Sequence, residues 1–341
     1  MRGRQWHLVR RSEGQPVASD VQLVDVDVPA AREGEVLVRN LTMSVEPYMR
    51  GRMTGESHSY IEPFGIDAPM AGAAVGRVLR SRAPEVPDGA LVLHDLGWRE
   101  YSVLRADQTR VLPAPTFEPA VYLGALNIPG MTAWIGLLEI GRCQPGDTVL
   151  ITSAAGAVGT MATQLATHLG AVVIGVAGTE RKLKLLRERL GLSAVFNHHE
   201  PAEAALAGAL ATASRTGIDV FFDNTAGPVQ EAAIGAMAEG GRVVLCGAVA
   251  AMRSTEPLPG PTNLRNAIWQ RLRLEGFLVL DHEHRRTEFE TRMTRWLRDG
   301  VIEDIHTVVG DGIEAAWDGF SDMLAGNAVG KAVVHIADDG S

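Results

Sequence analysis

The residues best placed to do chemistry lie between positions 148 and 159, which read TVLITSAAGAVG. The apolar run predicts a strand, and Met161, Leu165 and Leu169 recur at helical spacing after the glycines. The first N–H groups of a helix lack partners within it, and the helix dipole adds positive potential, so an anion binds there. We therefore expect a dinucleotide pyrophosphate at the residues that begin this helix: Gly156, Ala157, Val158 and Gly159.

The match to the glycine motif is incomplete, because Ala154 stands at its first glycine position. A chain with 37 glycines can also form such a turn only to pack a helix closely on a sheet. The apolar strand before the turn and the apolar helix pattern after it favour nucleotide binding.

The end of the second strand of such a fold selects the cofactor, because an acidic residue there binds the ribose of NAD and a basic group accepts the phosphate of NADP. That strand ends at Gly178 without a carboxylate, and Thr179 and Lys182 can hold a phosphate for which Gly178 leaves room. Glu180 is the competing ribose ligand, although the helix dipole alone favours an acid in a first helical turn. The sequence predicts NADPH.

The elements that must position these residues alternate between strand and helix from about Tyr122 onward. The expected elements are strands at 172–177, 194–197, 218–223, 242–247 and 274–278, and helices at 181–190, 201–213, 228–238, 263–271 and 285–298. Repeated strand–helix units predict an α/β fold with a doubly wound parallel sheet, the Rossmann architecture, over residues 123–305.

The first third of the chain has a different pattern, in which short apolar runs are separated by glycine, proline and charge. The expected strands are 21–28, 36–38, 74–79, 91–93 and 101–104. This pattern predicts a strand-rich, barrel-like domain, and the strand pattern at 331–336 may return to it. We expect a GroES-like catalytic domain made of residues 1–122 and 306–341.

The composition of the chain argues against several classes of partner and of cysteine site. A net charge of -9 without a basic tract argues against nucleic acid or a membrane surface as a partner. Two cysteines, Cys143 and Cys246, are too few for a disulfide framework or a thiolate zinc cluster, which favours a cytoplasmic protein. No stretch is apolar and long enough to span a bilayer, and residues 1–11 lack the apolar core of a signal peptide.

Four segments together resemble the zinc-free medium-chain dehydrogenase/reductases, within the branch of prostaglandin and leukotriene reductases, alkenal double-bond reductases and their bacterial counterparts. They are SVEPYMRGRM at 44–53, GMTAWIGLLEIG at 130–141, the glycine motif, and FDN at 222–224. The resemblance covers nearly the whole chain, and the PYMRGRM stretch is its most specific part.

The resemblance implies NADPH-dependent reduction of a carbon–carbon double bond conjugated to a carbonyl, in an α,β-unsaturated ketone or aldehyde. It also implies roles for residues that match the family's cofactor site: Lys182 at the 2′-phosphate, and Asn224, Cys246, Gly247, Ala248, Phe277, Leu278 and Asn327 elsewhere along the cofactor.

Two positions depart from the family pattern. His198 replaces a tyrosine that contacts the cofactor phosphate, and it can still donate a hydrogen bond. Leu280 replaces a tyrosine that many relatives place near the substrate, so the substrate is left open. We expect Tyr48, Met252 and Leu280 to line the substrate pocket.

The chemistry needs a donor for the carbonyl oxygen as it becomes an enolate, because the cofactor supplies the hydride. Tyr48 is the best side-chain candidate, and the family suggests the cofactor ribose hydroxyl as a second donor. Packing at a domain interface is the alternative role for Tyr48. Arg50 and Arg52 could bind an anionic substrate or form structural ion pairs.

Several alternatives stay open. His282 with His284, or His198 with His199, could ligate a metal, but neither pair has a recognisable third partner, so no metal site is expected. A quinone reductase using the same cofactor site is a second candidate enzyme, and a non-catalytic NADPH-binding protein is a third possible function.

The resemblance also implies a homodimer, with residues 243–277 as the contact region.

Overall fold

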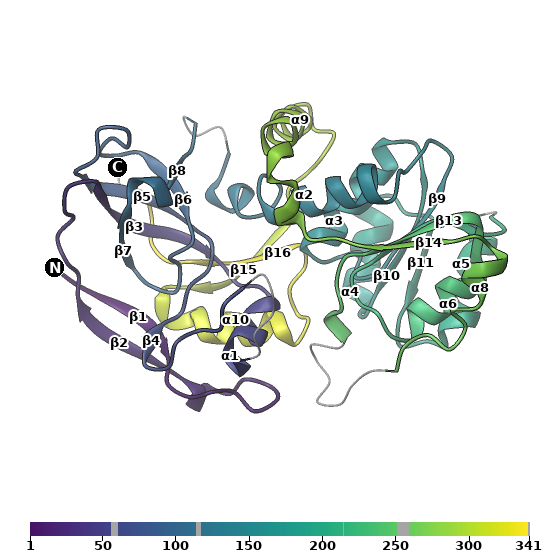
Figure 1. The fold of residues 1–341 in the computed structure, drawn as a ribbon, viewed down its shortest axis with the longest axis horizontal. Coiled ribbons are helices and arrows are strands. Elements are labelled where there is room, and N and C mark those ends of the chain that lie inside the picture. Colours follow the sequence, from purple (N-terminus) through teal and green to yellow (C-terminus); the bar gives the residue numbers. More distant parts are fainter. Residues whose placement is uncertain (56–60, 114–116, 214, 251–258, 340–341) are drawn as a thin grey trace. The chain divides into compact units, whose positions relative to one another are not determined.

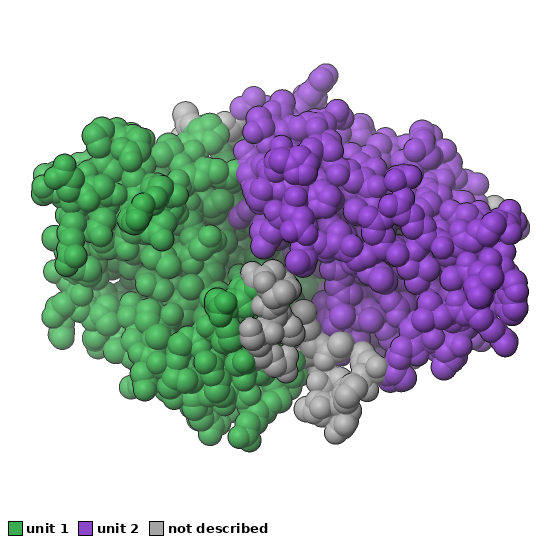
Figure 2. Space-filling view, viewed as in Figure 1, with its two compact units in different colours: residues 1–123, 306–341 green, residues 124–305 purple. Residues whose placement is uncertain are grey.

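The chain divides into two compact units, residues 1–123 with 306–341 and residues 124–305 (Figure 2). The structure is a computed structural model that describes residues 1–55, 61–113, 117–213, 215–250 and 259–339. We call the two parts unit 1 and unit 2 and treat each by itself.

Unit 2 is built on a six-stranded parallel sheet in the order β11-β10-β9-β12-β13-β14 (Figure 1). Its strands are β9 (Thr148–Ile151), β10 (Val172–Ala177), β11 (Ala194–Asn197), β12 (Ile218–Asp223), β13 (Met237–Leu245) and β14 (Arg273–Gly276). The apolar runs that predicted β10, β11 and β12 match the observed strands end to end. The expected doubly wound sheet is confirmed.

Helices cover both faces of this sheet. The helices of unit 2 are α2 (Ile128–Ile135), α3 (Ala157–His168), α4 (Glu180–Lys184), α5 (Ala202–Thr212), α6 (Pro228–Ala236), α8 (Asn266–Trp269) and α9 (Arg286–Arg298), of which α9 packs on α2. Ile174 of β10 packs in one apolar cluster with Leu206 of α5 and Val229 of α6. The next residue, Gly175, faces the opposite way, toward Leu186 in the turn after α4.

Strand β14 and helices α5, α6 and α9 begin and end within two residues of their predicted bounds, whereas three elements of unit 2 differ more. Strand β13 begins at Met237 and ends at Leu245, because the N–H groups of Cys246 and Gly247 leave the ladder and donate to the Asp223 carbonyl (2.9 and 3.0 Å). Helix α8 is four residues long: Asn263 instead donates its amide to the Glu231 carbonyl (2.7 Å), and the positive φ of Arg271 lies beyond its end. The helix expected at 181–190 widens after Lys184 into a π-helical turn, Leu185–Arg189.

Unit 1 is strand-rich, as expected. Its strands are β1 (Arg2–Leu8), β2 (Val21–Asp27), β3 (Glu35–Ser44), β4 (Ala68–Pro69), β5 (Ala74–Ser81), β6 (Leu91–His94), β7 (Tyr101–Arg105), β8 (Arg110–Val111), β15 (His306–Asp311) and β16 (Lys331–His335). They form a three-stranded sheet, β2-β1-β4, and a larger sheet in the order β15-β16-β3-β5-β6-β8, with β7 also paired to β3. Its α-helices are α1 (Tyr48–Thr54) and α10 (Ala316–Leu324).

Strand β3 is longer than the apolar run at 36–38 predicted. It continues through the polar Asn40, which is fully buried and donates its amide to the carbonyls of Leu96 (3.0 Å) and Arg99 (2.9 Å). These bonds satisfy the amide and remove most of the cost of burying it. The end of β3 pairs antiparallel with β16, so the C-terminal strand does return to the first part of the chain.

Within the described ranges, no helix is both long and apolar enough to cross a membrane.

Candidate functional site

The carboxyl ends of the parallel strands in unit 2 bring together most of the residues expected to bind the cofactor, because parallel strands all end at one edge of a sheet. The residues at or just beyond these strand ends are Gly156, Ala157, Val158, Gly159, Thr179, Lys182, His198, Asn224, Cys246, Gly247, Ala248, Phe277, Leu278 and Leu280. Tyr48 and Asn327 belong to unit 1. Met252 lies outside the described residues.

The glycine turn joins β9 to α3 through tightly packed backbone. The first hydrogen bond within the helix runs from Thr160 N to the Gly156 carbonyl (2.9 Å), and no side chain caps the helix. A Cβ on Gly159 would lie 2.1 Å from the Ser153 carbonyl oxygen, so only glycine allows this approach. The Gly156 N–H donates to the Ser153 carbonyl (2.9 Å), so the N–H groups of Ala157, Val158 and Gly159 are those that can serve an anionic ligand, and the turn fits a pyrophosphate.

The end of β10 presents the residues expected at the NADP phosphate. Thr179 caps α4 by accepting a hydrogen bond from Lys182 N (3.4 Å), and Lys182 is half-buried. Glu180, the competing ribose ligand, accepts a hydrogen bond from Arg187 (2.7 Å). The carboxylate is thus engaged on its own helix.

His198 occupies the space that we expected Gly178 to leave for a phosphate. A Cβ on Gly178 would lie 2.3 Å from Cε1 of the imidazole, so the ring packs directly on the glycine backbone. His198 is exposed, and its ring centroid is 4.1 Å from that of His199. The room at Gly178 therefore holds a side chain that can itself donate to a phosphate.

A buried carboxylate organises the loop after β12. Asp223 is 1 % exposed, and its Oδ1 accepts hydrogen bonds from Thr152 Oγ1 (2.9 Å), Thr225 N (2.9 Å) and Ala226 N (3.0 Å). Burial raises the pKa of this carboxyl, and the three hydrogen bonds oppose that rise. Asp223 thereby ties the end of β12 to the residue that begins the glycine turn.

Asn224 is held by the same network. Its backbone N–H donates to Thr152 Oγ1 (2.8 Å), and its side-chain amide donates to the Thr152 carbonyl (2.7 Å). One of the two amide N–H donors is thus engaged within the loop, and the side-chain oxygen can accept a hydrogen bond from a ligand. Sequence reasoning assigned no role to Thr152 or Asp223, although a carboxylate closing an otherwise apolar strand was a usable signal.

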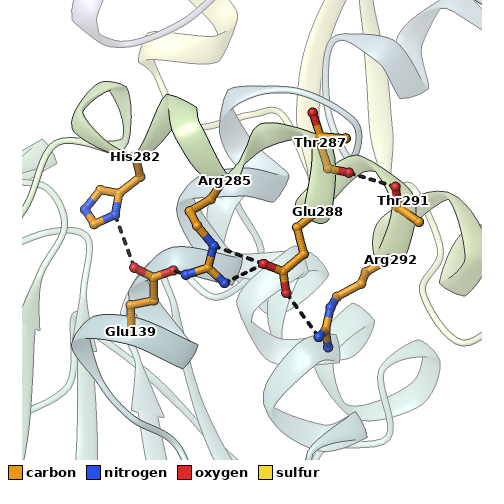
Figure 3. A network of polar contacts seen from close by, with 7 residues as sticks. All are labelled: Glu139, His282, Arg285, Thr287, Glu288, Thr291 and Arg292. Carbon is orange, nitrogen blue, oxygen red and sulfur yellow. Dashed lines mark hydrogen bonds and ion pairs between the residues drawn. The ribbon is translucent and has the colours of Figure 1, made fainter.

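The segment after β14 is anchored by the polar network in Figure 3. Glu139 bonds with Arg285, and its second oxygen lies 3.3 Å from His282 Nδ1. Arg285 also bonds to Glu288 (2.7 Å), which pairs with Arg292 (3.1 Å). These contacts fix the residues just after Phe277 and Leu278, so the backbone of that segment is held in place.

Glycine 136 lets the same segment approach the helix that carries Glu139. A Cβ at this position would lie 2.5 Å from the Phe222 ring and 3.2 Å from the Phe277 ring. The motif at 130–141 therefore shapes the wall formed by Phe277. Leu280 is 46 % exposed, so this aliphatic side chain is accessible where many relatives were expected to carry a tyrosine.

Tyr48 begins helix α1 in unit 1, directly after Pro47. Met49 and Met53 are fully buried on one side of the helix, whereas Tyr48 is half-buried and packs against the same apolar cluster. Arg52, one turn later, donates from its Nε to the Glu62 carbonyl (2.8 Å). The phenol ring is therefore held by its packing on the core of unit 1.

The approach to α1 is held by a buried ion pair that sequence reasoning did not find. Lys331 is 2 % exposed, and its ammonium contacts Glu46 Oε1 (2.5 Å) and Ser44 Oγ (2.5 Å). The pair joins the start of β16 to the residues just before Tyr48. Asn327, in the loop before β16, is exposed and donates its side-chain amide to Asp322 (3.2 Å).

No cluster of three or more histidine, cysteine, aspartate or glutamate side chains suited to a metal ion occurs in the part of the chain that the structure describes. His282 instead faces Glu139, and the ring of His198 is tilted by 42° against that of His199.

Taken alone, the edge of unit 2 can hold an anionic group at α3 and a second one near Lys182, and Tyr48 of unit 1 carries a hydroxyl.

Two family profiles match the chain: one described as the N-terminal domain of oxidoreductase covers residues 4–112, and one described as zinc-binding dehydrogenase covers residues 157–299.

Known proteins match along the full length. The chain is 36% identical over 343 residues to the NADPH-dependent curcumin reductase of Escherichia coli strain K12, covering 99% of this chain and 98% of that protein. It is 34% identical over 328 residues to the NADP-dependent 2-alkenal reductase of Nicotiana tabacum, covering 95% and 94%. The crystal structure of CurA from Vibrio vulnificus in complex with NADPH superposes with a TM-score of 0.90 at 34% identity, covering 98% and 99%.

Proposed function

The chain belongs to the medium-chain dehydrogenase/reductase family, in the branch of the prostaglandin and alkenal double-bond reductases, and from this premise we propose that it reduces the carbon–carbon double bond of α,β-unsaturated ketones or aldehydes with NADPH. The observation that carries the proposal is the edge of unit 2, where the open N-terminus of α3 and Lys182 follow neighbouring strands. Relatives at this level of identity that use NADPH on such double bonds support it.

Each part of the cofactor has candidate partners at that edge. We assign the pyrophosphate to the turn at residues 156–159, through the N–H groups of Ala157, Val158 and Gly159, and the 2′-phosphate to Thr179, Lys182 and His198. The nicotinamide half is then lined by Cys246, Gly247, Ala248, Phe277 and Leu278, and we assign Asn224 and Asn327 as further cofactor contacts. The fixed hydrogen bonds of Asp223 and Glu139 keep these loops in one arrangement, which lowers the entropy cost of binding.

The reaction asks little acid or base strength of the protein. Bound NADPH supplies the hydride that adds to the β-carbon. We propose that Tyr48 donates a hydrogen bond to the carbonyl oxygen, which gains negative charge as the enolate forms, and that water then protonates the α-carbon. The substrate pocket is assigned to Tyr48, Leu280 and Met252. An aliphatic Leu280 favours substrates with an apolar chain.

Consumption of NADPH by the purified protein tests the proposal. We expect NADPH absorbance to fall with a medium-chain alkenone, mass spectrometry to identify the saturated ketone, and NADH to be a poor replacement. Turnover with a simple quinone but not with the alkenone would instead identify a quinone reductase. Tight NADPH binding with neither acceptor consumed would identify a non-catalytic NADPH-binding protein.

A homodimer is the second part of the proposal. Strand β14 lies at one end of the sheet order, and three apolar side chains just before it are exposed: Leu264 (48%), Ile268 (75%) and Trp269 (63%). A second copy of the chain would cover them and continue the sheet, because the same patch faces itself across a two-fold axis.

The oligomeric state tests this part. We expect Trp269→Asp to convert a dimer to a monomer in analytical ultracentrifugation. Val308→Asp, which changes another exposed apolar residue in unit 1, should leave the mass unchanged. A wild-type monomer at assay concentration would contradict the proposal.

We also propose a cytoplasmic location. Cys143 and Cys246 are both free thiols, as is usual in a reducing compartment. Fractionation of the cells that make the protein would contradict the proposal if activity appeared outside the cytoplasm.

A further inference from the structure

Glu139 is the member of the polar network in Figure 3 that comes from a distant part of the chain. His282 and Arg285 lie in the segment after β14, and Glu288 and Arg292 lie in α9, whereas Glu139 lies 146 positions before Arg285, just after α2. Its carboxylate bonds with Arg285, and its second oxygen lies 3.3 Å from His282 Nδ1. Glu139 therefore ties the segment after β14 to the end of α2.

Arg285 is oriented by two further groups at the point where Glu139 meets it. Its guanidinium donates to Glu288 from Nε (3.0 Å) and Nη2 (2.7 Å), and its Cζ lies 5.0 Å from the centroid of the Trp134 ring in α2. Glu288 lies on the helix that Arg285 precedes, so this contact orients the guanidinium without attaching it to a distant element. The link from Arg285 to α2 and the turn after it comes from Glu139 and the Trp134 ring.

The turn that carries Glu139 is wider than an α-helical turn. Residues Gly136–Ile140 continue α2 as a π-helical turn, in which the Gly141 N–H donates to the Gly136 carbonyl (2.8 Å). Such turns are rare and occur often at functional sites. This turn meets the segment after β14 twice, because Gly136 lies against the Phe277 ring and Glu139 bonds with Arg285.

The Phe277 ring is enclosed by groups that this turn provides or holds. A Cβ on Gly136 would lie 3.2 Å from the Phe277 ring. The His282 ring meets Phe277 edge to face, with centroids 6.3 Å apart and planes at 79°, and His282 is also the side chain that faces the second oxygen of Glu139. One boundary of Phe277 is therefore the π-helical turn itself, and another is a ring that faces Glu139 of the same turn.

We propose that Glu139 is a positioning residue for the nicotinamide half of the cofactor: it fixes the wall formed by Phe277 through His282 and Arg285. The proposal rests on the proposed function, in which Phe277 and Leu278 line that half. A wall that is fixed before binding lowers the entropy cost of ordering the nicotinamide ring and holds the ring in one orientation for hydride transfer.

The first test compares two ligands and needs no activity. Adenosine 2′,5′-bisphosphate carries the 2′-phosphate of NADPH but lacks the nicotinamide half. We expect Glu139→Gln to weaken NADPH binding about fivefold, because the wall is no longer fixed before the cofactor binds. The affinity for adenosine 2′,5′-bisphosphate should stay within about twofold of the wild type, because changes at separate sites act independently. Titration calorimetry measures both affinities.

Glu303→Gln is the matched control. Glu303 is another carboxylate of unit 2 that pairs with an arginine far along the chain, since Arg189 Nε donates to it (2.9 Å). Neither residue belongs to the segment 277–285, so we expect this variant to bind both ligands as the wild type does. Unchanged NADPH affinity in Glu139→Gln, equal weakening of the two ligands, or an equal effect of Glu303→Gln overturns the proposal.

The second test is a double-mutant cycle at saturating NADPH. We expect Glu139→Gln to lower kcat on an enone about tenfold with little change in the KM for the enone, because a misplaced nicotinamide delivers hydride poorly. In the Arg285→Met background the same substitution should have a smaller further effect, because the bond between the two side chains is already lost. An equal loss of kcat in both backgrounds overturns the proposal.

Two outcomes keep the proposals apart. If the wild type binds NADPH but consumes no enone, the proposed function fails, while the comparison of the two ligands still decides the role of Glu139. If Glu139→Gln does not fold, Arg285→Lys carries both tests, because lysine keeps the charge but lacks the planar fork that serves Glu139 and Glu288 together. We then expect a partial loss of NADPH affinity and kcat, and unaltered values of both would count against the proposal.

Discussion

At the scale of single residues, we expect one side chain to affect the rate of the reaction and another to affect the affinity for the cofactor. Tyr48 packs its ring against the core of unit 1, and Lys182 lies in the helix that follows β10. The first should act on the rate of the reaction and the second on the choice of cofactor. Each can be removed with little change to the core.

Replacing Tyr48 with phenylalanine should lower kcat on enones about a hundredfold, the effect of losing one well-placed oxyanion donor, or about 3 kcal/mol. The ring keeps its packing against the core of unit 1, so the fold and NADPH affinity should stay near wild type. Steady-state kinetics and NADPH titration by fluorescence give both quantities. Unchanged turnover would remove Tyr48 from the mechanism.

Replacing Lys182 with alanine should weaken NADPH binding about tenfold to a hundredfold and leave NADH nearly unaffected, because a hydrogen bond to a charged group contributes about 1.5–3 kcal/mol. Titration calorimetry with both cofactors measures the difference. Lys184→Ala is the matched control, since this exposed lysine on the same helix faces Glu188 (3.8 Å). Equal weakening of NADPH and NADH would mean that Lys182 does not touch the 2′-phosphate.

At the scale of elements, the candidate site depends on how closely strands, turns and helices approach one another. The glycine turn brings α3 against the backbone at Ser153, whose φ of 50 bends the chain into the turn. The polar network around Glu139 likewise holds the segment after β14 in place. Neither arrangement can be inferred from the types of the side chains alone.

Gly159→Ala tests the close approach at the cofactor turn. The added methyl would lie 2.1 Å from the Ser153 carbonyl oxygen and 2.7 Å from Ala154 Cα, so α3 must shift. We expect the free energy of unfolding to fall by about 1–3 kcal/mol, the usual cost of overpacking, together with weaker NADPH binding. Urea denaturation and calorimetry measure both.

The control for this change is Gly208→Ala in the middle of α5, where a Cβ would meet nothing within 4 Å. Alanine is the better helix former, so we expect this variant to be more stable than the wild type by about 0.5–1 kcal/mol. If Gly159→Ala were as stable as the wild type, the close approach would have no energetic importance.

At the scale of the whole molecule, unit 1 is assembled from both ends of the chain. Lys331 from the C-terminal strand pairs with Glu46 from the N-terminal part, and β16 pairs with β3. A buried ion pair of this kind adds little net stability, yet losing one partner leaves an unpaired charge. The segment before Tyr48 therefore depends on residues nearly three hundred positions away.

Unit 1 should also lose stability in acid because of His94. Burial, with a smaller contribution from Arg99, lowers the pKa of this imidazole to about 3, and its Nδ1 accepts a hydrogen bond from Leu96 N (3.0 Å). Above pH 6.5 neither the folded nor the unfolded state binds a proton at His94. Between pH 6.5 and about 3 only the unfolded chain does, so stability falls as the pH falls.

The expected loss is about 2 kcal/mol between pH 6.5 and pH 5, at 1.4 kcal/mol per unit. Urea denaturation at several pH values measures it. His94→Asn keeps an acceptor for the Leu96 N–H and does not titrate, so its stability should fall less steeply over this range. Parallel curves for the variant and the wild type would show that His94 is not the group responsible.

Much of unit 2 could be predicted because its signals are local. The apolar runs of β10, β11 and β12 are each bounded by turn residues, and the glycine turn lies within twelve positions of the strand and helix that it joins. Element ends were predicted less well where a distant partner decides them, as Asp223 does for the end of β13. Asn40 is another case, since carbonyls far along the chain let a polar residue continue β3.

The sequence by itself determined the family, the two kinds of fold and the place of the glycine turn, because these depend on the order of neighbouring residues and on patterns with a short period. Only the tertiary structure decided that His198 fills the space at Gly178, that Asp223 and Thr152 hold Asn224, and that Arg52 is fixed by Glu62, Phe64 and Ala71 beside Tyr48. The physical reason is that each of these contacts depends on how strands, helices and loops pack in three dimensions. A hydrogen bond or a close approach between such elements leaves no periodic trace in the sequence.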